Sequence, residues 1–523
     1  MPRKPKAKNT LSAGERVALY EAAMAEKKRE LQGLGASAHS DNEKNDSASA
    51  AKREGMPAES KEVGADRGNR DSAATVRAKP KSATVRVDFS IPTGSIKPMH
   101  GMCNGPVSYG ADISGLFKEI GVPQVRFDGT DTAIGGVAID ISRIFKDLDA
   151  DPSDPECYDF ESTDRYVASA LHSGAKIIYR LGESRDLLGG KGGALDDVDV
   201  DLLSRVCVNV VRHYNGGWAD GAHYGIEYFE IWNAGDSPAM DLDRYGRLAN
   251  SVKMYDESLK VGGMSFDSIG AARDFLKSCK KRRYPVDFIT LDCFSDAVEE
   301  VCDGIGGLLA SAKGLGFDSL EIILGRWMLA DKAATGGLSL KEALGTQARI
   351  GEIRRELVRA QRSVKGAAYC AALMLALNST VGASAACFFD AQPATSPFCS
   401  LTDDLGTPQK PFYAFRAYGE LYRARTAVLC SVDRHEGMAH SGVYAAAALS
   451  DGGEAVVALA SFEGPGVIDV RLDGIMENHY SADVYMLDGV KNMELVDSVP
   501  ISGMKKRLVL NVSEYGAVLI KLH

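Results

Sequence analysis

Short apolar stretches alternate with longer amphipathic stretches between residues 98 and 425. The apolar stretches have the length of buried strands, and the longer ones repeat apolar residues at the spacing of a helix face. The predicted strands are residues 99–104, 124–127, 176–181, 226–232, 259–264, 287–294, 320–327 and 385–390. The predicted helices include residues 113–120, 163–173, 201–214, 243–258, 270–281, 297–313 and 339–377. Eight strands with intervening helices predict an α/β fold, a (β/α)8 TIM barrel over residues 98–425.

A doubly wound open sheet is the alternative arrangement for such a pattern. Its nucleotide-binding motif, GxGxxG at the first strand-to-helix turn, is absent from the sequence. We therefore expect the closed barrel.

The pattern changes again after residue 425, where short alternating stretches are separated by turn signals such as Asp473-Gly474. The alternating stretches are residues 443–449, 455–460, 467–471, 482–487, 506–510 and 517–521. They predict an antiparallel β-sandwich over residues 426–523. One more alternating strand, residues 84–89, lies in the segment 83–97 ahead of the barrel, and we expect it to join the sandwich.

Residues 1–82 differ from the rest of the chain in composition. Tyr20 is their only aromatic residue, and Ala, Ser, Lys, Glu and Gly dominate. Such a segment buries too little apolar surface to offset its conformational entropy, so it predicts a mostly disordered tail. Ser12 and Glu15 form a capping-box pattern ahead of helix-forming residues, which predicts a short helix at 10–34. That helix is either solvated or a docking site for a protein partner.

The predicted folded part of the chain is acidic. The 523 residues carry a net charge of −10, whereas residues 1–82 hold 17 Lys+Arg and 12 Asp+Glu and so carry +5. The rest of the chain therefore carries −15, which disfavours nucleic acid as a partner. No stretch approaches the roughly 20 apolar residues of a membrane span. Basic residues after Met1 are not followed by an apolar segment, so we expect a cytoplasmic protein without a membrane partner.

Cysteine and histidine patterns give no support for a metal site or a cofactor. The ten cysteines are scattered without a CxxC pair, and the nine histidines include no HExxH motif. Scattered thiols in a large chain are typical of buried small side chains in a reducing compartment.

The active site of a TIM barrel lies at the carboxyl ends of its strands. In this chain the predicted strand ends carry polar, acidic and aromatic residues, which suit a sugar because its ring has apolar C–H faces and a belt of hydroxyls. The candidate ligand-binding residues are Arg126, Asp128, Glu183, Trp232, Asn233, Asp292, Phe294, Arg326, Trp327, Asp390 and Gln392. Asn104 and Arg180 also lie at strand ends.

From residue 90 to residue 422 the chain resembles glycoside hydrolase family 39, the β-xylosidases and α-L-iduronidases. The matching motifs are residues 149–160, 174–184, 211–215, 224–233, 389–393 and 410–415. The resemblance implies a catalytic (β/α)8 barrel with a β-sandwich, and an O-glycosyl hydrolase activity.

The resemblance also implies where the two catalytic glutamates should be. The family's acid/base ends strand four in a Trp-Asn-Glu-Pro motif, whereas this chain has Ala234 in place of that glutamate. The family's nucleophile ends strand seven in a Glu-Trp pair, whereas this chain has Arg326 before Trp327. At the ends of strands six and two, Asp292 and Asp128 stand where the family usually has histidine. The chain thus shares the flanking motifs of the family, whereas the positions of both catalytic glutamates carry other residues.

A retaining glycosidase needs one carboxyl group as acid/base and a second as nucleophile. An alanine supplies no proton, and a guanidinium repels the positive charge of an oxocarbenium-like transition state. We therefore expect no retaining hydrolysis and assign no catalytic residue.

The individual residues allow two interpretations each. Arg326 either pairs with Asp128, Glu183, Asp292 or Asp390, or binds an acidic ligand group such as a uronate carboxylate. Trp327 is either a sugar platform or barrel packing, and Asn233 either contacts a sugar hydroxyl or holds a turn. Glu227 and Glu230 are expected to orient their neighbours within a strand. The residues that could act as relocated carboxylates are Asp128, Glu183, Asp236, Asp292 and Asp390.

Three hypotheses for the function follow. The first is a pseudoglycosidase that binds carbohydrate or serves as a scaffold. The second is an active glycosidase of the xylosidase or iduronidase type that uses relocated carboxylates. The third is an interaction protein that captures a protein partner through residues 1–82.

Overall fold

A computed structural model describes residues 82–108, 111–128, 138–183, 195, 197–231, 238–345, 349–392, 398–433 and 441–523. All of them belong to one compact unit, Lys79–His523. The predicted tail and its helix at 10–34 lie outside the described residues, and the predicted domain boundaries remain predictions.

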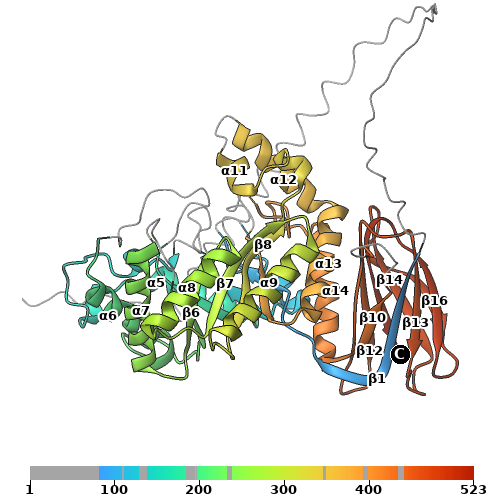
Figure 1. Ribbon diagram of the computed structural model, residues 1–523, viewed down its shortest axis with the longest axis horizontal. Helices are drawn as coiled ribbons and strands as arrows, with labels where there is room; N and C mark the ends of the chain where they lie inside the picture. Colours follow the sequence, from blue (N-terminus) through green and yellow to red (C-terminus); the bar gives the residue numbers. More distant parts are fainter. Residues whose placement is uncertain are drawn as a thin grey trace, which may run out of the picture. The chain divides into compact units, whose positions relative to one another are not determined.

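Eight parallel strands close into a barrel, as the sequence predicted (Figure 1). The strands are β2 (Gly101–Cys103), β3 (Gln124–Arg126), β4 (Lys176–Leu181), β5 (Tyr228–Ile231), β6 (Lys260–Phe266), β7 (Phe288–Ser295), β8 (Glu321–Leu329) and β9 (Ala383–Phe388). The barrel closes because β2 pairs in parallel with both β3 and β9. Counted from β2, the strand that carries Arg326 is the seventh.

Helices follow the barrel strands in chain order. They are α2 (Ser114–Ile120), α4 (Ile141–Ile144), α5 (Glu161–His172), α6 (Val200–Gly216), α7 (Pro238–Tyr255), α8 (Ile269–Arg282), α9 (Val298–Gly314), α10 (Lys332–Thr335), α11 (Leu340–Gly345), α12 (Ile350–Arg362), α13 (Val364–Ser379) and α14 (Lys410–Ala424), with a 3₁₀ turn at Pro155–Cys157. Their apolar faces and the strands share one continuous core.

The single helix predicted over residues 339–377 is wrong, because the described parts of this segment form α11, α12 and α13. Ser363 separates the last two. Its extended backbone ends α12, and its hydroxyl accepts hydrogen bonds from the backbone N–H groups of Lys365 and Gly366. A Cβ at Gly366 would lie 2.0 Å from the carbonyl oxygen of Gln361, so this tight turn requires glycine.

The remaining strands form a nine-stranded sheet in the order β15-β14-β17-β12-β11-β10-β1-β13-β16. They are β1 (Ala83–Ser95), β10 (Thr426–Val432), β11 (Val443–Leu449), β12 (Ala455–Phe462), β13 (Val467–Asp473), β14 (Ser481–Leu487), β15 (Asn492–Pro500), β16 (Lys506–Asn511) and β17 (Tyr515–Leu522). Figure 1 shows β1 beside the strands that follow the barrel, and it pairs with β10 and β13. The sheet is sandwich-like, but it departs from the predicted antiparallel arrangement because β1 and β13 run parallel.

Strand β12 explains how the sheet and the barrel are joined. All eight of its residues are buried, with none of the polar alternation of a half-exposed strand. Val457 and Leu459 belong to the core inside the sheet, whereas Val456 and Ala458 belong to the barrel core. Helices α13 and α14 contact β12, so both faces of this strand are covered by apolar groups.

Among the described helices, none combines the length and the apolar character that crossing a bilayer requires. All ten cysteines are free thiols that are buried or partly buried.

Candidate functional site

Polar side chains from five barrel strands are joined by hydrogen bonds at the carboxyl-terminal mouth of the barrel. Because the strands of this fold are parallel, their carboxyl ends open at one face. The group, named the mouth cluster here, consists of Arg126, Asp128, Glu230, Ser265, Thr290, Asp292 and Arg326.

Arg126 of β3 and Glu230 of β5 form a bidentate ion pair inside the barrel. Arg126 Nε donates to Glu230 Oε2 at 2.7 Å and Nη2 donates to Oε1 at 2.9 Å, and both side chains are fully buried. The Thr290 hydroxyl donates to Glu230 Oε1 at 2.5 Å. Burial lowers the pKa of Arg126 but Glu230 raises it, and the raised pKa prevails. The pair links β3 to β5, two strands away in the barrel, whereas Glu230 was expected to orient neighbours within its own strand.

Ser265, at the end of β6, connects this inner pair to the next one. Its hydroxyl donates to Asp292 Oδ1 at 2.8 Å and accepts from Arg126 Nη2 at 3.2 Å. Its backbone N–H donates to Thr290 Oγ1 at 2.8 Å. Sequence reasoning missed Ser265, although a polar residue directly after the predicted strand 259–264 was a usable signal.

Arg326 forms an ion pair with Asp292, which confirms one of the two interpretations of this arginine. Its Nη2 donates to Asp292 Oδ2, and its Nε lies 3.8 Å from Asp128 Oδ1. The guanidinium carbon lies 6.0 Å and 5.9 Å from the ring centroids of Phe294 and Phe389, within range of a cation–π attraction. The Arg326 side chain is 12% exposed and that of Asp292 5%, so this pair is largely removed from water.

The charge of Arg326 is stabilised more strongly than that of Asp292. Burial lowers the pKa of Arg326, but Asp292 and Asp128 outweigh it and the pKa is raised. Burial raises the pKa of the Asp292 carboxyl, and Arg326 opposes that shift. The pKa of the Asp292 carboxyl is raised overall, with burial as the main cause.

Asp128 offers an acceptor at the mouth. Its side chain is fully buried, and Oδ1 lies 3.3 Å from Arg126 Nη1. Its Oδ2 is buried and has no hydrogen-bond donor in the described part of the chain. A buried carboxylate oxygen without a donor is costly.

Asp390 and Gln392 lie at the end of β9 and bind mainly backbone and amide groups. Gln392 N donates to Asp390 Oδ1 at 2.6 Å, and Gln392 Nε2 donates to the Val107 carbonyl at 3.3 Å. Asn104 Nδ2 donates to Asp390 Oδ2 at 3.5 Å, while its Oδ1 accepts from the Asp128 N–H at 3.1 Å. All of these polar side chains are fully buried, so they hold the loops around the mouth.

Glu183 lies just beyond β4 and contacts a loop. Its Oε2 accepts from the Leu195 N–H at 3.3 Å, and Arg180 donates to Asp140 at 2.6 Å. Among the described residues no ion pair joins Glu183 to Arg326.

Trp327 is packed in the core, and its prediction as a ligand-binding residue is wrong. Its side chain is fully buried. The ring lies 5.1 Å from Phe388, 5.9 Å from Phe415 of α14 and 6.5 Å from Tyr369 of α13. It therefore joins β8 to these helices and cannot stack on a sugar at the mouth.

Four positions of the sequence argument lie outside the described residues. They are Trp232, Asn233, Ala234 and Asp236. Of the two positions that the family resemblance assigns to the catalytic glutamates, Ala234 lies outside the described residues and Arg326 lies in the mouth cluster. The described residues contain no group of three or more His, Cys, Asp or Glu that could hold a metal ion.

The barrel and its attached sheet form a glycoside hydrolase-like fold. No family model matches the chain. A curated β-xylosidase from Geobacillus stearothermophilus is 27% identical over 183 residues, which cover 31% of this chain and 35% of that protein. The match therefore spans about a third of the curated relative.

Solved structures extend the similarity to the whole described fold. A glucosidase from Croceicoccus marinus superposes with a TM-score of 0.66 and 19% identity, covering 84% of this chain and 98% of that one. A family 39 enzyme from Xanthomonas axonopodis pv. citri superposes with a TM-score of 0.59 and 13% identity, covering 86% and 99%. The resemblance to glycoside hydrolase family 39 is supported, and what these structures share with the chain is the fold.

Proposed function

We propose that this protein is a pseudoglycosidase, a glycoside hydrolase family 39-like barrel that does not hydrolyse glycosides and that binds carbohydrate or serves as a scaffold. The observation that carries the proposal is the ion pair of Arg326 with Asp292 at the end of the seventh strand. A nucleophile must present a free carboxylate to the anomeric carbon. Here a guanidinium occupies the position that the resemblance assigns to the nucleophile.

The same arrangement makes the neighbouring carboxylates poor replacements for the catalytic nucleophile. Asp292 is bound by Arg326 and Ser265, and Asp128 lies between Arg126 and Arg326. Attack by either carboxylate would leave a guanidinium without its counter-ion beside a positively charged transition state. Asp128 Oδ2 has no hydrogen-bond donor among the described residues, and such an acceptor is suited to binding a sugar hydroxyl without cleaving the sugar.

The proposal is tested by assaying the full-length protein against aryl β-xylosides, β-glucosides, α-arabinofuranosides and α-iduronides. We expect no turnover above the rate without protein. Turnover that disappears in Asp292→Asn would overturn the proposal. Binding is tested by thermal shift with xylose, arabinose and uronic acids, where we expect a stabilisation that Asp128→Asn reduces.

A relocated acid is the second candidate, and the position of Asp292 in the mouth cluster, where burial raises its pKa, favours it. A general acid needs a carboxyl that keeps its proton near neutral pH. If Asp292 serves in this way, turnover rises as the pH falls and is lost in Asp292→Asn but kept in Glu183→Gln. Loss in the Glu183 variant alone would point to a different acid.

Two further expectations remain proposals. The ten free thiols support a cytoplasmic location. Partner capture through residues 1–82 is tested by a pulldown with and without that segment, where loss of capture without loss of barrel stability would support the interaction hypothesis.

A further inference from the structure

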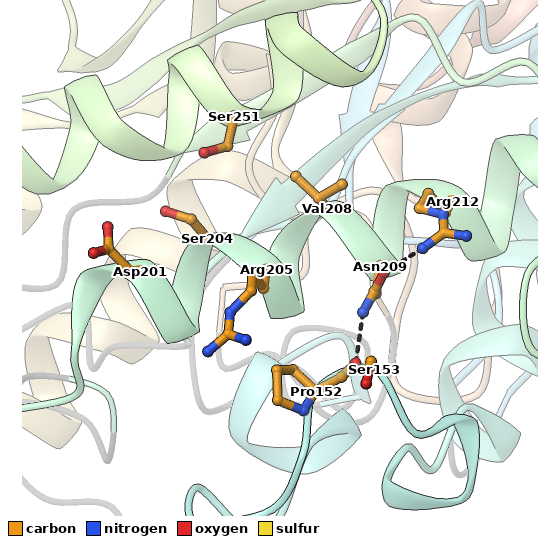
Figure 2. Close-up of a pocket in the computed structure, with 9 residues that line it drawn as sticks. All are labelled: Pro152, Ser153, Asp201, Ser204, Arg205, Val208, Asn209, Arg212 and Ser251. Atoms are coloured by element: carbon orange, nitrogen blue, oxygen red, sulfur yellow. Dashed lines mark hydrogen bonds between the residues drawn. The ribbon is translucent and has the colours of Figure 1, made fainter.

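A pocket of about 520 Å³ lies on the outer surface of α6, within the range of pockets that hold small ligands. Figure 2 shows α6 with Ser251 of α7 on one side and Pro152 and Ser153 on the other. Its polar lining residues include Ser153, Asp201, Ser204, Arg205, Asn209 and Arg212. None of them belongs to the mouth cluster.

Two arginines of α6 line this pocket. Arg205 and Arg212 are seven residues apart on α6, which places them on one helix face roughly 10 Å apart along the axis. Figure 2 shows Asn209 between them. Arg205 is exposed and Arg212 is partly buried.

The neighbouring side chains hold Arg212 in place. Its Nη1 donates to Asn209 Oδ1 at 3.0 Å, and its guanidinium carbon lies 5.5 Å from the centroid of the Trp218 ring. Asn209 Nδ2 in turn donates to the Pro152 carbonyl at 2.7 Å and to the Tyr158 hydroxyl at 3.1 Å. A guanidinium fixed in this way loses less side-chain entropy when it binds an anion.

The nearest carboxylates already have other partners. Asp201 pairs with Arg247 at 2.7 Å. Asp151 Oδ1 accepts from the N–H and the hydroxyl of Ser153, which lower the pKa of Asp151 more than the charge of Arg205 does. Neither Arg205 nor Arg212 has a carboxylate within ion-pair distance in the part of the chain that the structure describes.

We propose that this pocket binds a small dianion with two oxyanion groups, one held by each arginine. Guanidinium groups bind carboxylate and phosphate oxygens in a planar, bidentate geometry. The site is separate from the mouth cluster, and it does not depend on the proposed pseudoglycosidase function.

The test is isothermal titration of the full-length protein with alkane bisphosphonates of two to eight methylene groups, and with a monophosphonate as reference. We expect one bisphosphonate to bind per chain, with the tightest binding at one spacer length and a monophosphonate about tenfold weaker or worse. Equal affinity for the monophosphonate would overturn the two-group site, and no binding by any member of the series would overturn the site altogether.

Substitutions of the two arginines test whether the bisphosphonate binds in this pocket. Arg205→Gln and Arg212→Lys should each weaken the preferred bisphosphonate about tenfold, because the first removes a charge and the second keeps the charge but loses the planar fork. Arg273→Gln, at an exposed arginine of α8, is the matched control and should leave the affinity unchanged. Equal weakening in the control would indicate general charge attraction and would overturn the assignment to α6.

Discussion

Arg326→Leu removes the guanidinium that holds the mouth cluster together and leaves most of the local volume filled. Asp292 and Asp128 then remain buried beside an apolar side chain. Breaking a buried ion pair by deleting one partner costs about 3–5 kcal/mol of folding free energy. We expect a loss of that size near pH 8.

The double variant Arg326→Leu with Asp292→Leu separates this cost from simple loss of packing. Replacing both charged partners by apolar groups can be nearly neutral, because no charge is left buried without a partner. We therefore expect the double variant to regain much of the stability that Arg326→Leu loses, so that the costs of the two single substitutions are not additive.

The pH dependence gives a second measure of the same effect. In Arg326→Leu the Asp292 carboxyl loses the cation that opposes the burial-induced rise of its pKa. In the folded variant the pKa of Asp292 then lies further above its value in the unfolded chain, so folding takes up a proton. The free energy of unfolding of the variant therefore rises, relative to that of the unsubstituted protein, as the pH falls through this pKa. The deficit should be smaller at pH 5 than at pH 8.

Urea unfolding followed by tryptophan fluorescence and by far-UV circular dichroism measures these differences. The control is Arg359→Leu, an exposed arginine of α12 with a local ion pair to Glu356, which should cost less than about 1 kcal/mol. A similarly small cost for Arg326→Leu, or a deficit that does not depend on pH, would refute the view that this pair organises the mouth.

Three other predictions concern the framework. His100 is fully buried and burial lowers its pKa to about 3, whereas the unfolded histidine binds a proton near pH 6.5. Acid therefore destabilises the fold, and between pH 6.5 and pH 5 the protein should lose roughly 2 kcal/mol relative to His100→Gln in urea titrations. Trp327→Ala should cost about 3–5 kcal/mol by the same measurement, with unchanged ligand affinity if a mouth ligand is found. Gly366→Ala should cost about 1–3 kcal/mol because its Cβ meets the Gln361 carbonyl, whereas Gly307→Ala on open α9 should gain up to about 1 kcal/mol; equal effects would contradict the steric argument.

The barrel could be predicted because each strand carries its own local signal. The predicted strand 176–181 coincides with β4, and the predicted 287–294 differs from β7 by one residue at each end. β15 was missed because most of its residues are exposed, so no regular alternation marks it. The continuous helix predicted over 339–377 is broken between α12 and α13 because one serine cap outweighs helix propensity on both of its sides.

The candidate site could be predicted only as a set of strand-end residues. Their positions at the ends of predicted strands indicated that Arg126, Asp128, Asp292 and Arg326 lie at one mouth of the barrel. In the structure these residues are joined by hydrogen bonds and ion pairs. The place of a residue in the sequence does not show whether its side chain points into the barrel or outward, so Trp327 was wrongly predicted to bind a ligand. Burial and ring contacts, which depend on the helices outside the barrel, decide that question.

The pairing of Arg326 with Asp292 depends on an irregularity between β7 and β8 that no local pattern reveals. Leu291 is opposite Leu324 in the register, but Asp292 is opposite Arg326, so Gly325 is an extra residue in β8. Residues opposite each other in neighbouring strands project to the same face of the sheet, so the bulge is what turns both charged side chains to one side. A side chain at position 325 would meet Arg126 Nε at 3.2 Å and Thr290 Cβ at 3.0 Å. The glycine thus makes room for the inner ion pair and sets the register of the outer one, and Arg326 is part of an ion network that extends from β3 to β8.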